Sequence, residues 1–171
     1  YEAVTYEGEI ETFADPYAFL PQFSDYDLYL LSEGRHLYSY EKFGAHFTTV
    51  DGVEGVCFAV WAPNAYRVSV IGDFNHWDAR VHPMRRYVEN GIWELFVPGL
   101  VIGDKYKFDI RSSIGNYHTE KTDPYAFAAE LRPRTASVVT ELGGYEWDDD
   151  EWMTQRAESD PLTRPMSIYE V

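Results

Sequence analysis

The chain has 171 residues and a formal net charge of −15 at pH 7. A field of that sign repels nucleic acid and anionic lipid, so we expect neither as a partner, whereas a neutral ligand is indifferent to it. Cys57 is the only cysteine, which excludes an internal disulfide. Because the sequence also shows no signal-peptide pattern and no apolar run near the ~20 residues of a membrane helix, we expect a cytoplasmic protein without a membrane partner.

Near its N-terminus the sequence predicts one short helix, over residues 25–33. Ser24 can cap this helix, Asp27 suits the positive end of the helix dipole, and Gly34 can end it. We expect the rest of residues 1–53 to be connecting structure, so that this segment forms a partly helical extension.

From residue 54 onwards, apolar and polar residues alternate with a period of two, which is typical of strands. The pattern predicts strands at residues 56–61, 67–70, 84–88, 92–97, 105–111, 117–120 and 136–140. Both sides of the first strand are apolar, so we expect both to be buried, with Trp61 in the core. Trp93 is the second core tryptophan that the pattern predicts. Short strands at this spacing indicate an all-β fold, an antiparallel sandwich over residues 54–140.

Asn90 and Gly91 lie between two of these predicted strands. This dipeptide favours a tight hairpin, because a type I′ turn needs two residues that tolerate a positive φ. We therefore expect residues 84–88 and 92–97 to pair.

The segment Gly72-Asp73-Phe74-Asn75-His76-Trp77 follows a predicted strand and leaves a large aromatic side chain in a turn. Trp77 has little core to join there, so its flat face is free to stack, and a sugar ring is the partner that such a face favours. Asn75 could bond a sugar hydroxyl, or it could bond its own backbone as turn residues often do.

Residues 141–165 contain a Gly pair, two prolines and a run of four acidic residues, which indicates an acidic linker. That run lacks the glycine and the spacing of a calcium loop, and the histidines have no metal-ligand spacing, so we expect neither a metal site nor a cofactor. The apolar residues 166–171 are typical of the start of a strand in a further domain, so we expect the chain to be a fragment.

Ten segments together resemble one family. The matching segments are residues 29–34, 44–46, 58–65, 68–77, 82–84, 91–99, 106–108, 123–127, 132–137 and 167–171. They are similar to the amino-terminal part of the 1,4-α-glucan (glycogen) branching enzymes, over nearly the whole chain. The resemblance implies an immunoglobulin-like carbohydrate-binding module of the glycogen-binding type at residues 54–140. It also implies that residues 166–171 begin the catalytic barrel.

The family cuts an α-1,4 glucan and transfers the piece to form an α-1,6 branch, using an Asp nucleophile and a Glu acid/base. By the resemblance these carboxylates lie outside this chain. We therefore expect no catalytic residues here, and no branching activity from the chain alone. The expected partners are α-1,4 glucan, as glycogen or maltooligosaccharides, and the catalytic barrel of the same protein.

The resemblance also implies sugar-binding residues besides Trp77. Lys107 matches a lysine that donates to sugar hydroxyls. Tyr117 stands where relatives place a second stacking tryptophan, and so offers a smaller ring. Thr135 matches a binding threonine, whereas Ser137 stands near the position of a hydrogen-bonding asparagine and reaches less far.

Two alternatives remain open at the sequence level. The module could serve as an interdomain scaffold that holds the barrel without binding sugar. It could also belong to a debranching or trehalose-pathway relative, since those families share the Trp61-Ala62-Pro63 and Phe74-Asn75 signatures.

Overall fold

The structure is a computed structural model, and its description covers residues 2–4, 6 and 8–171. The chain divides into two compact units, Tyr1–Glu141 and Leu142–Val171. The strands are β1 (Glu2–Val4), β2 (Ile10–Thr12), β3 (Gly44–Val50), β4 (Val53–Trp61), β5 (Ala65–Gly72), β6 (Arg85–Tyr87), β7 (Ile92–Pro98), β8 (Lys105–Ser112), β9 (His118–Lys121), β10 (Ala128–Ala129) and β11 (Ser137–Val138). The helices are α1 (Asp25–Ser32) and α2 (Asp150–Glu158), with 3-10 turns η1 (Pro16–Ala18), η2 (Ser39–Glu41), η3 (Asp73–Asn75) and η4 (Pro161–Thr163).

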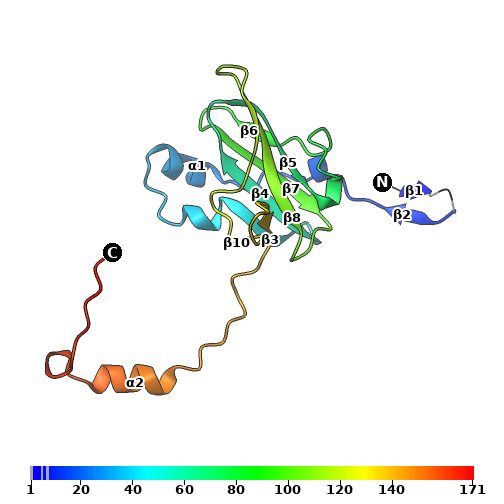
Figure 1. The fold of residues 1–171 in the computed structure, drawn as a ribbon. Coiled ribbons are helices and arrows are strands. Elements are labelled where there is room, and N and C mark those ends of the chain that lie inside the picture. The colour runs from blue at the N-terminus through cyan, green and yellow to red at the C-terminus, as the bar shows by residue number, and fades with distance from the viewer. Residues whose placement is uncertain (1, 5, 7) are drawn as a thin grey trace. The chain divides into compact units, whose positions relative to one another are not determined.

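Two antiparallel sheets face each other in the first unit (Figure 1). One has the strand order β3-β4-β7-β6, and the other has the order β10-β11-β8-β5 with β9 paired to β8. β1 and β2 pair only with each other. The two large sheets together form the immunoglobulin-like sandwich that the sequence and the resemblance predict.

The main core lies between the two sheets and follows from the period-two pattern of the strands. Phe58 on β4 and Leu95 on β7 come from one sheet, and Val70 on β5 and Phe108 on β8 come from the other. Trp93 belongs to the same core, as predicted, and its Nε1 donates to the carbonyl of Ala62.

The outer face of the β3-β4-β7-β6 sheet is also buried, because residues 16–43, the cover segment, pack on it. Phe23 and Phe43 cluster with Ala59 and Ile92. The ring of Phe19 meets that of Phe96 edge-on, with centroids 4.7 Å apart.

Within the cover segment, α1 begins as the sequence predicts. The Ser24 hydroxyl accepts from the backbone N–H of Asp27, and the Asp27 carboxylate accepts from the N–H of Ser24. Two backbone donors that a helix end leaves unpaired are thereby satisfied.

Glu94 on β7 fastens the cover segment to the sheet. Its side chain is 3% exposed and accepts hydrogen bonds from the backbone N–H groups of Gln22 and Phe23, at 2.7 and 3.2 Å, and from the Tyr87 hydroxyl at 2.8 Å. Arg85 on β6 adds two bonds from its guanidinium to carbonyls of the same segment. The attachment therefore combines apolar packing with a buried, fully bonded carboxylate.

Two expectations about the first sheet are wrong. Trp61 is 63% exposed, because it is the last residue of β4 and lies where the cover segment no longer shields the sheet. β3 occupies part of the stretch expected to be connecting structure, so the sandwich begins before residue 54. Asp51 and Gly52, with φ of 51° and 80°, join β3 to β4 in a tight hairpin.

The predicted hairpin between β6 and β7 is present, but its turn differs from the expected one. Gly91 has a φ of 68°, whereas Asn90 has no positive φ, and the connection spans residues 88–91. A side chain at Gly91 would place a Cβ 2.5 Å from the Cα of Pro63, so glycine is needed for close approach as well.

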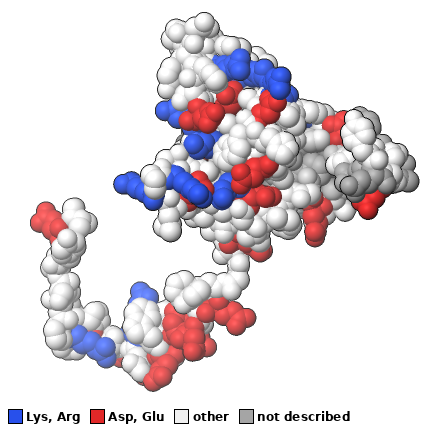
Figure 2. Space-filling view, turned by 45° about the vertical axis from the view of Figure 1, so that its right-hand side comes forward, with Lys and Arg blue, Asp and Glu red and all other residues white. Residues whose placement is uncertain are grey.

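The second unit holds α2, which the expectation of a plain linker over residues 141–165 missed. Asp150 and Glu151 stand in its first turn, where acidic groups favour the helix dipole. Figure 2 shows acidic side chains gathered on this part of the chain, whereas both signs are interspersed over the sandwich. Residues 166–171 adopt no helix or strand.

With 8 and 9 residues, α1 and α2 fall far short of a bilayer's thickness, and the described part of the chain contains no membrane-spanning helix.

Candidate functional site

The turn at residues 72–77 is held by its own side chains and by contacts with the strands beside it. Gly72 is in extended backbone, and a Cβ there would lie 2.2 Å from the carbonyl oxygen of Lys105, so only glycine fits. Phe74 points inwards and stacks near Phe58, with ring centroids 6.2 Å apart. One small residue and one inserted ring therefore fix the start of the turn against the sandwich.

Asn75 holds the middle of the turn. It is 4% exposed; its Oδ1 accepts from the N–H of Gly72, and its Nδ2 donates to the carbonyl of Val70 and to Nδ1 of His82. Both ends of the amide are thus occupied within the protein. The sugar-binding prediction for Asn75 is wrong, and the alternative of bonding to the local backbone is confirmed.

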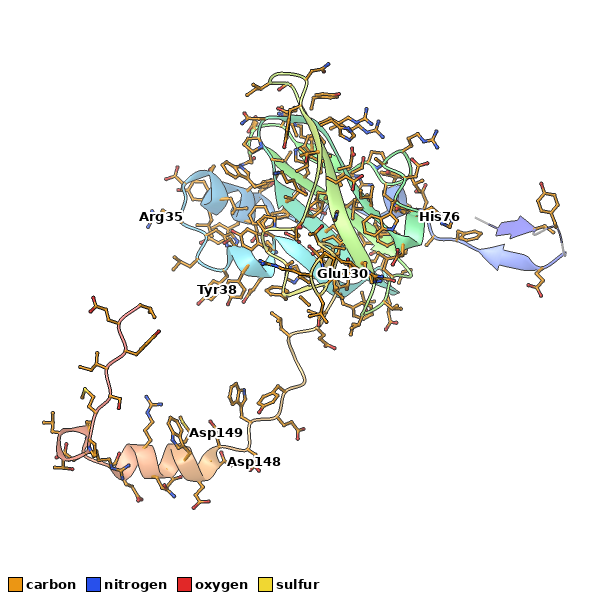
Figure 3. The ribbon with its side chains drawn as sticks, viewed as in Figure 1. Arg35, Tyr38, His76, Glu130, Asp148 and Asp149 are labelled. Carbon is orange, nitrogen blue, oxygen red and sulfur yellow. The ribbon has the colours of Figure 1, made fainter. Side chains whose placement is uncertain are left out.

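Two consecutive left-handed residues then turn the chain outwards. His76 and Trp77 have φ of 54° and 59°, a conformation that non-glycine residues seldom adopt. The half-buried indole of Trp77 is held by a hydrogen bond of 2.9 Å from its Nε1 to Oδ1 of Asp73. In Figure 3, His76 lies on the side of the sandwich opposite Tyr38.

Trp77 lines a shallow hollow of about 340 Å³ on the outer face of the second sheet, called the Trp77 hollow. The other lining residues come from β8, β9 and the loop between β10 and β11. They are Lys107, Glu120, Glu130, Arg134, Thr135 and Ala136.

Ion pairs join the Trp77 turn, β8 and the β10–β11 loop around the Trp77 hollow. Lys105 Nζ lies 3.8 Å from Asp73 Oδ2 and 3.5 Å from Glu130 Oε1. Arg134 Nη1 lies 3.7 Å from the same Glu130 oxygen. Among the described residues Lys107 forms no ion pair, so its ammonium is available to a ligand.

The structure brings together three of the six predicted site residues. Trp77, Lys107 and Thr135 line one hollow. Ser137 is fully buried and accepts from the backbone N–H of Asp123, so the prediction that it contacts sugar is wrong. Tyr117 is exposed but lies level with Ser112, at the opposite end of β8 from Lys107, and does not line the Trp77 hollow.

Sequence reasoning missed the charged rim of the hollow. Glu120, Glu130 and Arg134 were not predicted, because their approach to Trp77 depends on how β9 and the β10–β11 loop pair around β8. The only local signal is the acid and base at positions 130 and 134, on opposite sides of a turn that closes with a bond from Arg134 N to Leu131 O.

The arrangement suits a neutral polyhydroxylated ligand. An indole face meets C–H groups, a free ammonium donates to hydroxyl oxygens, and carboxylates accept from hydroxyl hydrogens. No group of three or more metal-ligating side chains occurs among the described residues.

Comparison with known proteins places this geometry in context. Residues 42–126 match the family described as carbohydrate-binding module 48 (isoamylase N-terminal domain). The chain is 56% identical over 173 residues to a 1,4-alpha-glucan branching enzyme of Thermosynechococcus vestitus, covering all of this chain and 22% of that protein. It is 52% identical over 165 residues to the 1,4-alpha-glucan branching enzyme of Methylococcus capsulatus, covering 96% of this chain and 22% of that protein. The chain thus spans about a fifth of the length of these relatives.

A solved structure of Klebsiella pneumoniae pullulanase complexed with maltotriose also aligns with the chain. The alignment has a TM-score of 0.48 and 28% identity, and it covers 60% of this chain and 10% of that one.

Proposed function

Because residues 42–126 belong to the carbohydrate-binding module 48 family, we propose that the Trp77 hollow binds α-1,4-glucan chains on behalf of a 1,4-α-glucan branching enzyme. The observation that carries this proposal is the Trp77 ring, held by Asp73 beside Lys107 and Thr135. The ring stacks on one glucose unit, while the polar side chains bond its hydroxyls.

The parent protein in this proposal is a cytoplasmic enzyme of glycogen biosynthesis. The chain takes no part in bond cleavage, and its role is to hold glucan near the catalytic barrel of the same protein. The 52–56% identity to branching enzymes over nearly the whole chain supports this assignment.

A calorimetric titration of the chain with maltoheptaose tests the glucan-binding role. We expect weak, saturable binding. In Trp77→Ala the affinity should fall about tenfold, because the lost stacking interaction contributes about 1.4 kcal/mol to the binding free energy. Trp147→Ala is the matched control, since Trp147 is an exposed tryptophan of the other unit. Unchanged affinity in a folded Trp77→Ala chain would contradict the proposal.

A second candidate role, as a scaffold for the barrel, is favoured by the exposed apolar side chains of the cover segment. Tyr26, Tyr29, Leu37 and Tyr38 are all more than half exposed. In this role the cover segment packs on the catalytic domain. Absence of maltoheptaose binding, together with concentration-dependent association of the chain, would favour it over glucan binding.

A further inference from the structure

A second and larger hollow, of about 560 Å³, lies where β4 ends, and it is called here the Trp61 hollow. Its lining comes from four separate parts of the chain and shares no residue with the Trp77 hollow. The side chains that matter for its chemistry are Leu31, Phe43, Trp61, Glu89, Asn90 and Tyr125. Its volume falls within the range of about 300–1,000 Å³ that is typical of small-molecule sites.

The walls of this hollow are fixed by hydrogen bonds and ring contacts. Trp61 Nε1 donates to the backbone carbonyl of Asn90 at 3.0 Å, which leaves the indole largely exposed yet anchored. Asn90 Nδ2 in turn donates to the carbonyl of Leu28 at 3.1 Å, which ties the loop to α1. The rings of Phe43 and Tyr125 pack with centroids 5.3 Å apart.

Two side chains of the hollow, Glu89 and Asn90, offer hydrogen-bond acceptors to a ligand. The exposed Glu89 carboxylate and Asn90 Oδ1 receive no hydrogen bond from the described residues. The lining contains no Lys or Arg, so nothing in it would attract an anion. An aromatic face next to free acceptors matches a neutral ligand with an apolar ring face and hydroxyl groups on its edge.

We propose that the Trp61 hollow is a second saccharide-binding site, in which a hexose ring stacks on Trp61 and gives its hydroxyl hydrogens to Glu89 and Asn90. The choice of an α-glucan as its ligand rests on the proposed function, whereas the site itself rests on the geometry described above. The chain then holds two glucan segments at once, on separate faces of the sandwich.

The five tryptophans allow each site to be followed by its own indole N–H resonance in a titration with maltotriose or maltoheptaose. We expect the Trp61 signal to shift and saturate at millimolar sugar, and to do so equally in Trp77→Ala. In Trp61→Ala the Trp77 signal should still shift. Glu89→Ala, which keeps both rings, should weaken the response at Trp61 several-fold and leave that at Trp77 unchanged.

The outcomes separate the two proposals. A Trp61 signal that stays unmoved in the Trp77→Ala chain, at sugar concentrations that saturate Trp77 in the unaltered chain, overturns the second site alone. A Trp77 signal that stays unmoved while Trp61 responds overturns the assignment of binding to the Trp77 hollow and leaves the second site standing. If Trp61→Ala fails to fold, Trp61→Phe and Glu89→Ala still decide the matter, because an unchanged response in the folded Glu89→Ala chain contradicts the proposed contacts.

Discussion

The two hollows present an anchored tryptophan by opposite means. Trp77 belongs to one continuous turn, in which Asp73 and Asn75 supply the supporting contacts. Trp61 is the end of a strand, and its hollow exists only because α1 and the cover segment pack beside it. The support of the Trp77 ring is therefore local in sequence, whereas that of Trp61 comes from distant segments, so it should be possible to damage either support without the other.

The largest effect is expected from Glu94→Ala. This change leaves the buried N–H of Phe23 and the partly buried N–H of Gln22 without an acceptor, at a cost of about 3 kcal/mol in the free energy of unfolding. The cover segment should loosen, so sugar binding at Trp61 should fall while binding at Trp77 persists. Urea unfolding and the indole titration measure the two effects.

Glu54→Ala is the control for that experiment, since Glu54 is an exposed glutamate on β4. Equal losses at both tryptophans in Glu94→Ala would show that the two hollows are not independent.

Asn75→Ala should have an intermediate effect, and it should damage the Trp77 hollow where Glu94→Ala damages the Trp61 hollow. The buried N–H of Gly72 and carbonyl of Val70 lose their partner, which costs about 2 kcal/mol of stability. Binding at Trp77 should weaken, and binding at Trp61 should not. Asn64→Ala, at an exposed turn position, serves as the control; a response at Trp77 no weaker than in that control would refute the supporting role of Asn75.

The smallest effect is a pH dependence confined to the Trp77 turn. Burial lowers the pKa of His82 below its ordinary value of about 6.5, and its neutral ring accepts from Asn75 at Nδ1. With a lowered folded-state pKa, the unfolded chain binds the proton first, so this stabilisation is complete above about pH 6.5 and is lost as pH falls through the folded-state pKa.

We expect the free energy of unfolding to decline from pH 7 to 5 by less than about 1.4 kcal/mol per pH unit, and the melting temperature and binding at Trp77 to decline with it. His82→Gln should flatten this decline, whereas His76→Gln, at an exposed histidine of the same turn, should not. A decline that is the same in all three chains would rule out His82 as its source.

The sequence predicted what is encoded locally. The sandwich, α1 with its Ser24 cap and the Trp77 turn follow from periodicity, capping residues and turn chemistry, each visible within a few positions. β3 was within reach of the same reasoning, because Asp51-Gly52 favours a hairpin.

The failures concern contacts between distant segments. Alternation along β4 predicted burial on both faces, but it could not indicate where the cover segment ends, and so Trp61 was placed in the core. Ser137 matched a binding position along the chain, yet pairing of β11 with β8 buries it against Asp123. Glu130 and Arg134 reach Trp77 through a loop whose position only the sheet pairing defines.

Both indoles are tied down through their Nε1 groups before any ligand arrives, Trp77 to Asp73 and Trp61 to Asn90. Their rotational freedom is therefore lost on folding and not on association. The conformational entropy still to be lost on binding belongs mainly to the saccharide. Both sites should consequently favour glucans that are already stiff or curved, such as cyclic or helical segments, over flexible chains of the same length.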